Sequence, residues 1–355
     1  MQEADCVVSI DDDNEHAAEQ QRRLQSLKKE LRRTFLSLRR DRALADELNE
    51  LISDEQLVSE AMDKDLGGRL VEGRALVILG ESGAGKSRSI HRALSDRFGN
   101  YQAANAPTRL ISITAPSPCT LKQLGTSVLR ATGYETRRDL KENVVWAMVR
   151  RRLKDLNIRF LHIDELQHAV QMKSDGEIQK VRDTLKGLMQ TPEWSVSLIL
   201  SGLPELAVFI QGDTQVRRRC RFIRFEPLVP GRDAKKVGTM IRNLARRADV
   251  SADHVLASTS LALRLIHAAS AQFGIAIELA QDAILAAVRE GHKQLTLGHF
   301  ATTYHARTGC APSENIFSIS ADFLLIDPQR ALEDAPKTTI SADGAPKRPK
   351  DKRNA

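Results

Sequence analysis

The sequence predicts a parallel α/β sheet with helices on both of its faces, followed by a small all-α region. Short apolar runs alternate with helix-like stretches from residue 63 to residue 230, and this alternation favours parallel strands joined by crossover helices. After Pro227 and Pro230 no further strand-like run follows, and helical patterns continue to about residue 310. We therefore expect an α/β domain over 63–230 and a helical lid domain over 231–310.

The predicted strands are short runs of Val, Ile, Leu and Phe. The first, Ala75–Leu79, is bounded by Gly73 and Gly80, and the others lie at 110–114, 159–163, 196–200 and, more weakly, 221–225. Apolar residues at three- and four-residue steps predict helices between them, at 86–98, 120–132, 139–155, 174–190 and 203–211. The same pattern in the lid predicts helices at 232–248, 251–257, 260–272, 275–290 and 296–307.

Charge is distributed unevenly outside these two regions. Residues 1–20 carry seven acids and no Lys or Arg, and we expect 1–18 to be disordered. Residues 21–43 carry nine bases against two acids. Within 19–62 apolar residues recur at helical steps (Leu24, Leu27, Leu31, Phe35, Leu38), which predicts a basic amphipathic helical arm. Residues 328–355 are expected to form a disordered basic tail.

The composition narrows the classes of protein that are possible. The net charge of +7 favours a polyanionic partner such as DNA. The four cysteines show no C-x-x-C pair, so neither a zinc site nor a disulfide framework is predicted. No apolar run reaches the roughly 20 residues that span a bilayer, and the first residues do not resemble a signal peptide. We expect a cytoplasmic protein that does not associate with a membrane.

A phosphate-binding loop follows the first predicted strand. The segment matches G-x-x-x-x-G-K-[ST] in full: Gly80, Glu81, Ser82, Gly83, Ala84, Gly85, Lys86 and Ser87. Such a loop turns backbone amides toward the phosphates of ATP and ends at a helix N-terminus, which favours anions. In this pattern Lys86 contacts the β- and γ-phosphates, and the Ser87 hydroxyl binds Mg²⁺.

Two adjacent acids follow the third predicted strand. Asp164 is expected to hold the Mg²⁺ shell, and Glu165 to act as the general base on the attacking water. The alternative is that both acids cap the next helix, but their place in the chain after the phosphate-binding loop favours hydrolysis. His162 is more typical of a residue within the strand than of a catalyst.

Two further features belong to the predicted site. Ser201, at the end of the fourth strand, is a candidate for contact with the γ-phosphate or the water, although a serine that simply ends a strand fits nearly as well. The run 217–221 holds four arginines. An arginine from this run can enter the nucleotide site of a neighbouring subunit and stabilise transferring charge. Arg219 is favoured, with Arg218 and Arg221 as alternates; a solvated basic face is the usual reading of such a run.

These residues together resemble the TniB/TnsC group of AAA+ ATPases, which serve DNA transposition, and they are also similar to ExeA/GspA-type secretion ATPases. The resemblance covers about residues 45–307 and is carried by the following segments: Gly80–Ser87, Ile163-Asp164-Glu165, Ser201-Gly202-Leu203-Pro204-Glu205-Leu206, and Asp213-Thr214-Gln215 followed by arginines. It implies the AAA+ fold and a helical lid, and it places the finger at Arg219.

The sequence departs from that group at two places. Gln167 occupies a position where TniB proteins tend to have histidine, and His168 follows it, so a role for either is in doubt. Residues 273–279 contain no arginine of the kind that many AAA+ lids use to sense nucleotide. Arg264 is a substitute, although a surface helical arginine is the stronger interpretation.

The resemblance implies an ATP-dependent, DNA-binding homo-oligomer, a ring or a filament, that recruits or activates a partner transposase. DNA contact would use backbone phosphates and would not read sequence. Two alternatives are a secretion-associated ATPase and a nucleotide-dependent switch without significant turnover. The basic arm has an alternative as well, since it could dock on the protein with its bases simply solvated.

Overall fold

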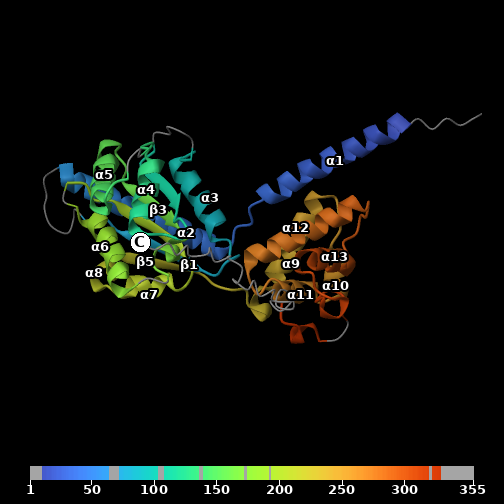
Figure 1. Ribbon diagram of the computed structural model, residues 1–355. Coiled ribbons are helices and arrows are strands. Elements are labelled where there is room, and N and C mark those ends of the chain that lie inside the picture. Colours follow the sequence, from blue (N-terminus) through green and yellow to red (C-terminus); the bar gives the residue numbers. More distant parts are fainter. Residues whose placement is uncertain are drawn as a thin grey trace, which may run out of the picture.

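The structure is a computed structural model that describes residues 10–63, 72–102, 108–135, 139–171, 174–191, 193–319 and 322–328. Residues 1–9 of the predicted acidic segment and 329–355 of the predicted basic tail lie outside the described residues. Figure 1 shows an α/β body and a helical body, with α1 (Ile10–Arg33) lying along the helical body and extending beyond it.

The α/β body is built on a five-stranded parallel sheet in the order β2-β3-β4-β1-β5. Its strands are β1 (Ala75–Gly80), β2 (Leu110–Thr114), β3 (Phe160–Asp164), β4 (Ser197–Gly202) and β5 (Cys220–Phe225). All five predicted strands are therefore present, each within two residues of its expected limits. Because the strands run parallel, their carboxyl ends meet at one edge, which is where open α/β sheets bind ligands.

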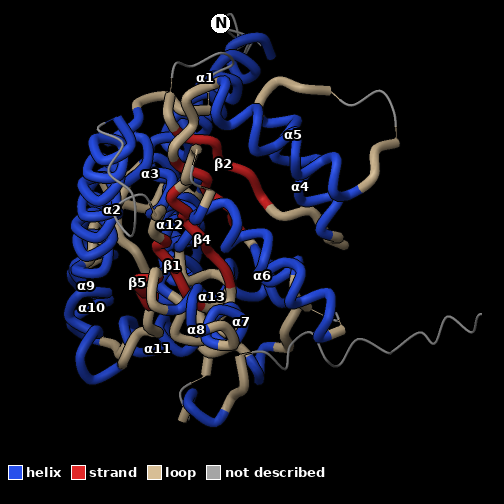
Figure 2. The backbone as a smooth tube through the Cα atoms, turned by 90° about the vertical axis from the view of Figure 1, so that its left-hand side faces the viewer, coloured by secondary structure: helices blue, strands red, loops and turns tan. Residues whose placement is uncertain are grey.

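Helices cover both faces of the sheet, as predicted (Figure 2). They are α3 (Lys86–Phe98), α4 (Leu121–Ala131), α5 (Glu142–Asp155), α6 (Asp175–Gln190), α7 (Leu206–Gln211) and α8 (Thr214–Arg217), with a 3₁₀ turn at Leu166–Ala169. Two separate apolar clusters fill the faces. Helices α4–α8 pack against one face, and α3 packs with α2 (Arg39–Asp63) against the other.

The helical body follows directly in the chain. It comprises α9 (Pro230–Arg247), α10 (Asp253–Ser258), α11 (Leu261–Ala268), α12 (Phe273–Arg289) and α13 (Leu297–Thr308), with 3₁₀ turns at Pro312–Glu314 and Phe323–Leu325. A third apolar cluster lies at its centre, and this cluster includes Leu31 of α1, which is fully buried. Helix α1, which precedes the α/β body in the chain, therefore completes the core of the lid.

The arm differs from the prediction, because it forms two helices with a break at residues 34–38. Asp41 explains the restart, since its Oδ2 accepts the amide of Leu38 at 2.6 Å and so satisfies a free N–H at the start of α2. The two helices also have different partners, because α1 contacts α12 whereas α2 contacts α3, β1 and β5. Residues 10–18, which were predicted to be disordered, belong to α1.

Among the described helices, none alone has the length and apolar character needed to cross a membrane, although α11 and α12, bent by 120°, pass that test as a pair.

Candidate functional site

The predicted phosphate-binding loop joins β1 to α3. Gly83 and Gly85 have φ angles of 76° and 93°, a region that glycine occupies at little cost. Gly80 is required for a different reason, because a Cβ there would lie 2.8 Å from the Cβ of Phe225. Helix α3 begins at Lys86, so the loop leads into a helix N-terminus whose free amides and dipole favour an anion.

Lys86 lies within this loop. Its side chain is buried, and Nζ donates to the carbonyl oxygens of Gly80 at 2.7 Å and Glu81 at 3.1 Å. Burial lowers the pKa of the Lys86 ammonium, and the nearby carboxylates of Glu165 and Asp164 oppose that shift. A cation held in a desolvated loop beside free amides is well placed to bind phosphate oxygens.

Ser87 and Asp164 meet at the carboxyl edge of the sheet. The hydroxyl of Ser87 donates to Oδ2 of Asp164 at 2.8 Å. Burial raises the pKa of Asp164, but hydrogen bonds from Ser201 and Ser87 outweigh burial, and the pKa lies below its usual value. A hydroxyl and an ionised carboxylate are the oxygen donors that Mg²⁺ prefers, so these two residues fit the cation that the sequence predicted.

A chain of polar residues holds Asp164 from behind. Ser201 donates to Oδ1 of Asp164 at 2.5 Å, His162 Nε2 lies 3.2 Å from the Ser201 hydroxyl, and Ser112 lies 2.8 Å from His162 Nδ1. The side chains at 162 and 164 share one face because strand residues alternate with period two. Burial lowers the pKa of His162 to about 4, so the ring is neutral at pH 7 and donates from one nitrogen only.

This network contradicts one prediction and adds to another. Ser201 has no exposed surface, and its hydroxyl is engaged with Asp164; it therefore orients the acid and is not open to a phosphate or a water, as the sequence had suggested. His162 is a buried strand residue, as predicted, but it also links two serines of neighbouring strands. The sequence indicated this only through spacing, because His162 lies two residues before Asp164 and therefore on the same face of the strand.

Glu165 follows Asp164 in a left-handed conformation with φ of 54°. The amide of Gln167 donates to Oε2 of Glu165, and its Oε1 accepts the backbone N–H of Leu203 at 3.2 Å. A Cβ on Gly202 would lie 2.4 Å from the same Oε1, so glycine there permits the approach. Gln167, whose role was in doubt from the sequence, thus connects the end of β3 to the end of β4 and holds the predicted general base.

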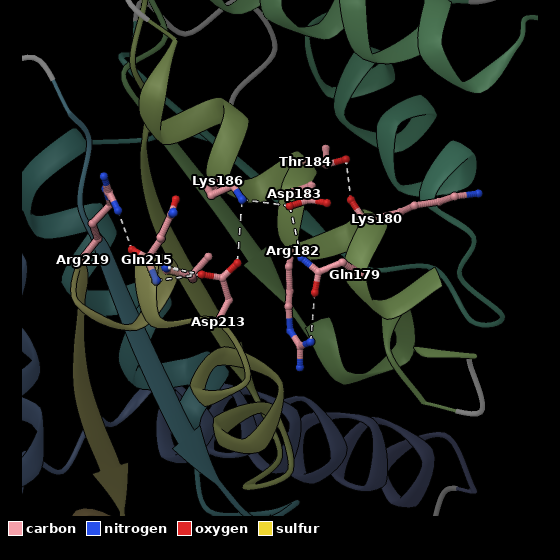
Figure 3. A network of polar contacts seen from close by, with 10 residues as sticks. Gln179, Lys180, Arg182, Asp183, Thr184, Lys186, Asp213, Gln215 and Arg219 are labelled. Carbon is pink, nitrogen blue, oxygen red and sulfur yellow. Dashed lines mark hydrogen bonds and ion pairs between the residues drawn. The ribbon is translucent and has the colours of Figure 1, made fainter. Parts of the chain in front are cut away.

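The structure contradicts the choice of Arg219 as a finger that reaches a neighbouring subunit. Its side chain is 1% exposed and Nη2 lies 2.6 Å from Oε1 of Glu72. A second guanidinium nitrogen donates to the carbonyl of Gln215 at 2.5 Å. Figure 3 shows this bond beside the start of α8, which is capped by Asp213. Arg219 therefore fixes β5 and α8 inside one subunit.

The other arginines of the run differ in their surroundings. Arg221 is half-exposed and lies within 4 Å of three acids of α2, which are Glu47, Glu50 and Asp54. Arg218 is exposed, and its guanidinium makes no hydrogen bond or ion pair with any other described residue. Arg264 is not the surface residue that the sequence had suggested, because it is buried and donates to the carbonyl of Ile316.

Among the described residues, one other cluster has the composition of a metal site. Glu290, His292 and His299 bring one carboxylate oxygen and two ring nitrogens to within 3.0–3.2 Å of one another. However, Nδ1 of His299 accepts the backbone N–H of Thr296 at 3.0 Å, whereas a metal-bound histidine normally donates from its second nitrogen. The cluster is better explained as a hydrogen-bonded cap between α12 and α13.

The five-stranded parallel sheet and the loop after β1 define an α/β domain of the P-loop type. Residues 64–228 match the family model described as Bacterial TniB protein, which confirms the predicted resemblance over that range. The match covers the whole sheet and ends at the lid. A search of the curated proteins finds no match to this chain.

Several solved structures show a weaker likeness. The Aeropyrum pernix ORC1 protein in complex with DNA is 16% identical, with a TM-score of 0.48, covering 74% of this chain and 65% of that one. The A. pernix ORC2 protein in ADPNP–ADP complexes is 13% identical, with a TM-score of 0.49 and coverage of 75% and 71%. The Thermotoga maritima RuvB branch migration motor is 11% identical, with a TM-score of 0.40 and coverage of 76% and 70%. Likenesses this weak say nothing about activity.

Proposed function

We propose that this chain is a cytoplasmic ATPase that assembles on DNA as a homo-oligomer and recruits or activates a partner transposase. One observation carries the ATPase part of the proposal. The Ser87–Asp164 hydrogen bond joins the phosphate-binding loop to the acids after β3, so that Lys86, Ser87, Asp164 and Glu165 meet at one edge of the sheet.

In the proposed reaction, Lys86 and the amides at the start of α3 bind the β- and γ-phosphates. Glu165 accepts a proton from the water that attacks the γ-phosphorus, while the bond from that phosphorus to the β,γ-bridging oxygen breaks and ADP leaves. Gln167 holds the Glu165 carboxylate by a hydrogen bond. Ser87 and Asp164 would hold Mg²⁺, which when bound neutralises charge on the phosphates. The polar chain through Ser201 keeps Asp164 ionised and fixed.

The exposed bases of α1 support the DNA part. Its apolar stripe faces the lid, where Leu31 is fully buried and Leu27 is partly buried. The exposed positions carry six bases, namely Arg22, Arg23, Lys28, Lys29, Arg32 and Arg33. Lys28 and Arg32 line a groove that α1 forms with α12 and α13, but all six bases are exposed and can contact phosphates. The TniB match supports transposition as the process that is served.

An oligomer would supply an arginine to each site from a neighbouring subunit. Transferring phosphoryl groups are commonly stabilised by an arginine, often from a partner. Within the run at 217–221, Arg217 and Arg218 are both exposed, and neither has an ion pair with a described residue. We assign the finger to Arg218, which was an alternate in the prediction from sequence, because Arg219 is committed to Glu72 and Arg221 to α2.

The proposal is tested by phosphate release with and without random duplex DNA, together with DNA affinity across a salt series. We expect turnover that rises with DNA and with protein concentration. Changing four bases of α1 to Gln (Lys28, Lys29, Arg32, Arg33) should reduce the salt slope by up to about 0.9 for each lost phosphate contact. The matched control changes four exposed bases elsewhere, at Arg130, Lys141, Arg151 and Lys180.

Two results would contradict the proposal. Equal loss of affinity in both quadruple variants would mean that α1 is not the DNA surface. Nucleotide binding without any turnover, even with DNA present, would favour the nucleotide-dependent switch over the ATPase.

A further inference from the structure

Two carbonyl groups of the phosphate-binding loop are held by residues outside the loop. The carbonyl of Gly83 accepts the backbone N–H of Gly274, at the start of α12, at 2.9 Å. The carbonyl of Ala84 accepts Nη2 of Arg40, from α2, at 2.6 Å. Because the C=O and N–H of a trans peptide point in opposite directions, an Ala84 carbonyl that is turned outward directs the N–H of Gly85 into the loop.

Arg40 lies where several elements meet. Its guanidinium carbon is 4.5 Å from the ring centre of Phe225, at the end of β5, and 5.2 Å from that of Phe273, in α12. Contacts of this kind stabilise a cation against an aromatic face. The side chain therefore joins α2, the phosphate-binding loop, the sheet and the lid, although the sequence had counted it among the bases that contact DNA.

The chain on either side of Arg40 is fastened to the first turn of α3. Arg88 donates to the carbonyls of Arg32 and Thr34, the latter at 2.9 Å. Ser89 donates to Oδ1 of Asp41 at 2.6 Å. Residues 32–41, which we call the strap, are thus bound to the residues that directly follow Lys86 and Ser87.

The other end of the strap is anchored in the lid. Gln281 of α12 donates to the carbonyl of Leu31 at 2.7 Å, and Glu30 lies 3.5 Å from Arg247 of α9. The strap therefore passes from the lid across the loop to the α/β body. Any movement of the lid relative to the loop must move the strap or break these bonds.

We propose that the strap couples the phosphate-binding loop to α1, with Arg40 as the positioning residue that sets the loop for phosphate. Nucleotide in the loop and DNA on α1 then alter each other's affinity by the same factor, as linkage requires. The DNA half of this inference rests on the proposed function. The positioning half concerns the loop alone and can be measured without DNA.

The test uses Arg40→Met in the full chain. Methionine fills the space between the two rings but cannot donate to Ala84, which limits the loss of packing. We expect the Kd for a fluorescent ADP to rise by about tenfold, the usual scale for losing a hydrogen bond from a charged donor. Arg40→Lys, which keeps the charge and a donor, should recover part of that loss. The control is Arg130→Met, the same change at an exposed position of α4.

A second measurement addresses the coupling. The ADP affinity of the wild type and of Arg40→Met is measured with and without a random duplex. For the variant, the ratio of the ADP affinity with duplex to the ADP affinity without it should fall to about one. A thermal melt of each variant shows whether it is still folded. If Arg40→Met melts like the wild type but binds ADP more weakly, the inference is supported. Unchanged ADP binding in Arg40→Met overturns it. Failure of the wild type to bind ADP would instead contradict the proposed function.

Discussion

The hydroxyl of Ser87 and the carboxylate of Asp164 are 77 residues apart in the chain and share a hydrogen bond of 2.8 Å. Ser87 belongs to the phosphate-binding loop after β1, and Asp164 ends β3. The parallel sheet brings the two residues together at its carboxyl edge. If they hold Mg²⁺, Ser87→Ala should raise the Mg²⁺ concentration for half-maximal turnover by about tenfold or more. A magnesium titration of phosphate release checks this. Ser95→Ala, further along the same helix α3, tests whether the effect is specific to the site.

Replacing Glu165 by Gln should abolish turnover but leave nucleotide binding intact. The amide keeps the size of the side chain but cannot accept a proton from water, and loss of a general base typically lowers kcat by about 10²–10⁴-fold. Single-turnover phosphate release and ADP affinity should be measured on the same preparation. Turnover near the wild-type level would assign the base to another residue.

Arg218 and Arg219 should give different kinds of defect when each is changed to Ala. Arg218→Ala should lower turnover without changing the melting temperature, because the side chain is exposed. Arg219→Ala leaves Glu72 without its buried partner and should cost about 1–3 kcal/mol of unfolding free energy.

Mixing variants distinguishes a shared site from a local one. Arg218→Ala mixed with Glu165→Gln should regain part of the lost turnover, because some interfaces then contain an intact base and an intact arginine. The absence of any recovery on mixing would mean that Arg218 does not act between subunits.

The lid should lose stability in acid partly through Asp233. A hydrogen bond from Arg232 lowers the pKa of the Asp233 carboxyl, burial raises it, and hydrogen bonds from Lys236 and the amide of Val229 lower it further. The pKa of Asp233 therefore lies well below its usual value. A carboxyl whose pKa is lowered on folding stabilises the fold above its unfolded pKa, near 3.9, and that contribution is lost as pH falls toward the folded pKa.

Asp233→Asn should therefore reduce stability at pH 7 by about 1–3 kcal/mol, with a smaller difference from the wild type below pH 4 or so. Urea unfolding followed by circular dichroism at several pH values measures both quantities. An equal destabilisation at every pH would show that the charge of Asp233 is not the cause.

The local pattern of the sequence was enough to predict the α/β body. The strand Ala75–Leu79, the loop Gly80–Ser87 and the helix that begins near Lys86 follow from apolar runs, glycines and a helix N-terminus, all of which are local signals. The strand order and the hydrogen bond from Ser87 to Asp164 depend on packing between distant segments, and no local pattern contains them.

The run at 217–221 shows why side-chain roles were harder to predict. Its four arginines look alike in sequence, yet Arg219 is buried because Glu72 lies beside it, while Arg218 points to solvent. The same holds for Arg40. Its charge in the sequence grouped it with the bases expected to bind DNA, but in the fold it donates to the carbonyl of Ala84. Gln167 likewise gains its role from Leu203, directly after the end of β4.

The position of Leu31 in the core of the lid also determines when α1 can fold onto its partner during synthesis. Its carbonyl is bonded to Gln281, 250 positions later, so α1 leaves the ribosome well before its partner in α12 is made. Until then its leucines remain exposed to other chains, and such exposure promotes aggregation. The arm is thus a point of risk during synthesis, and a truncation that begins after it would expose the matching apolar surface of the lid for as long as the protein exists.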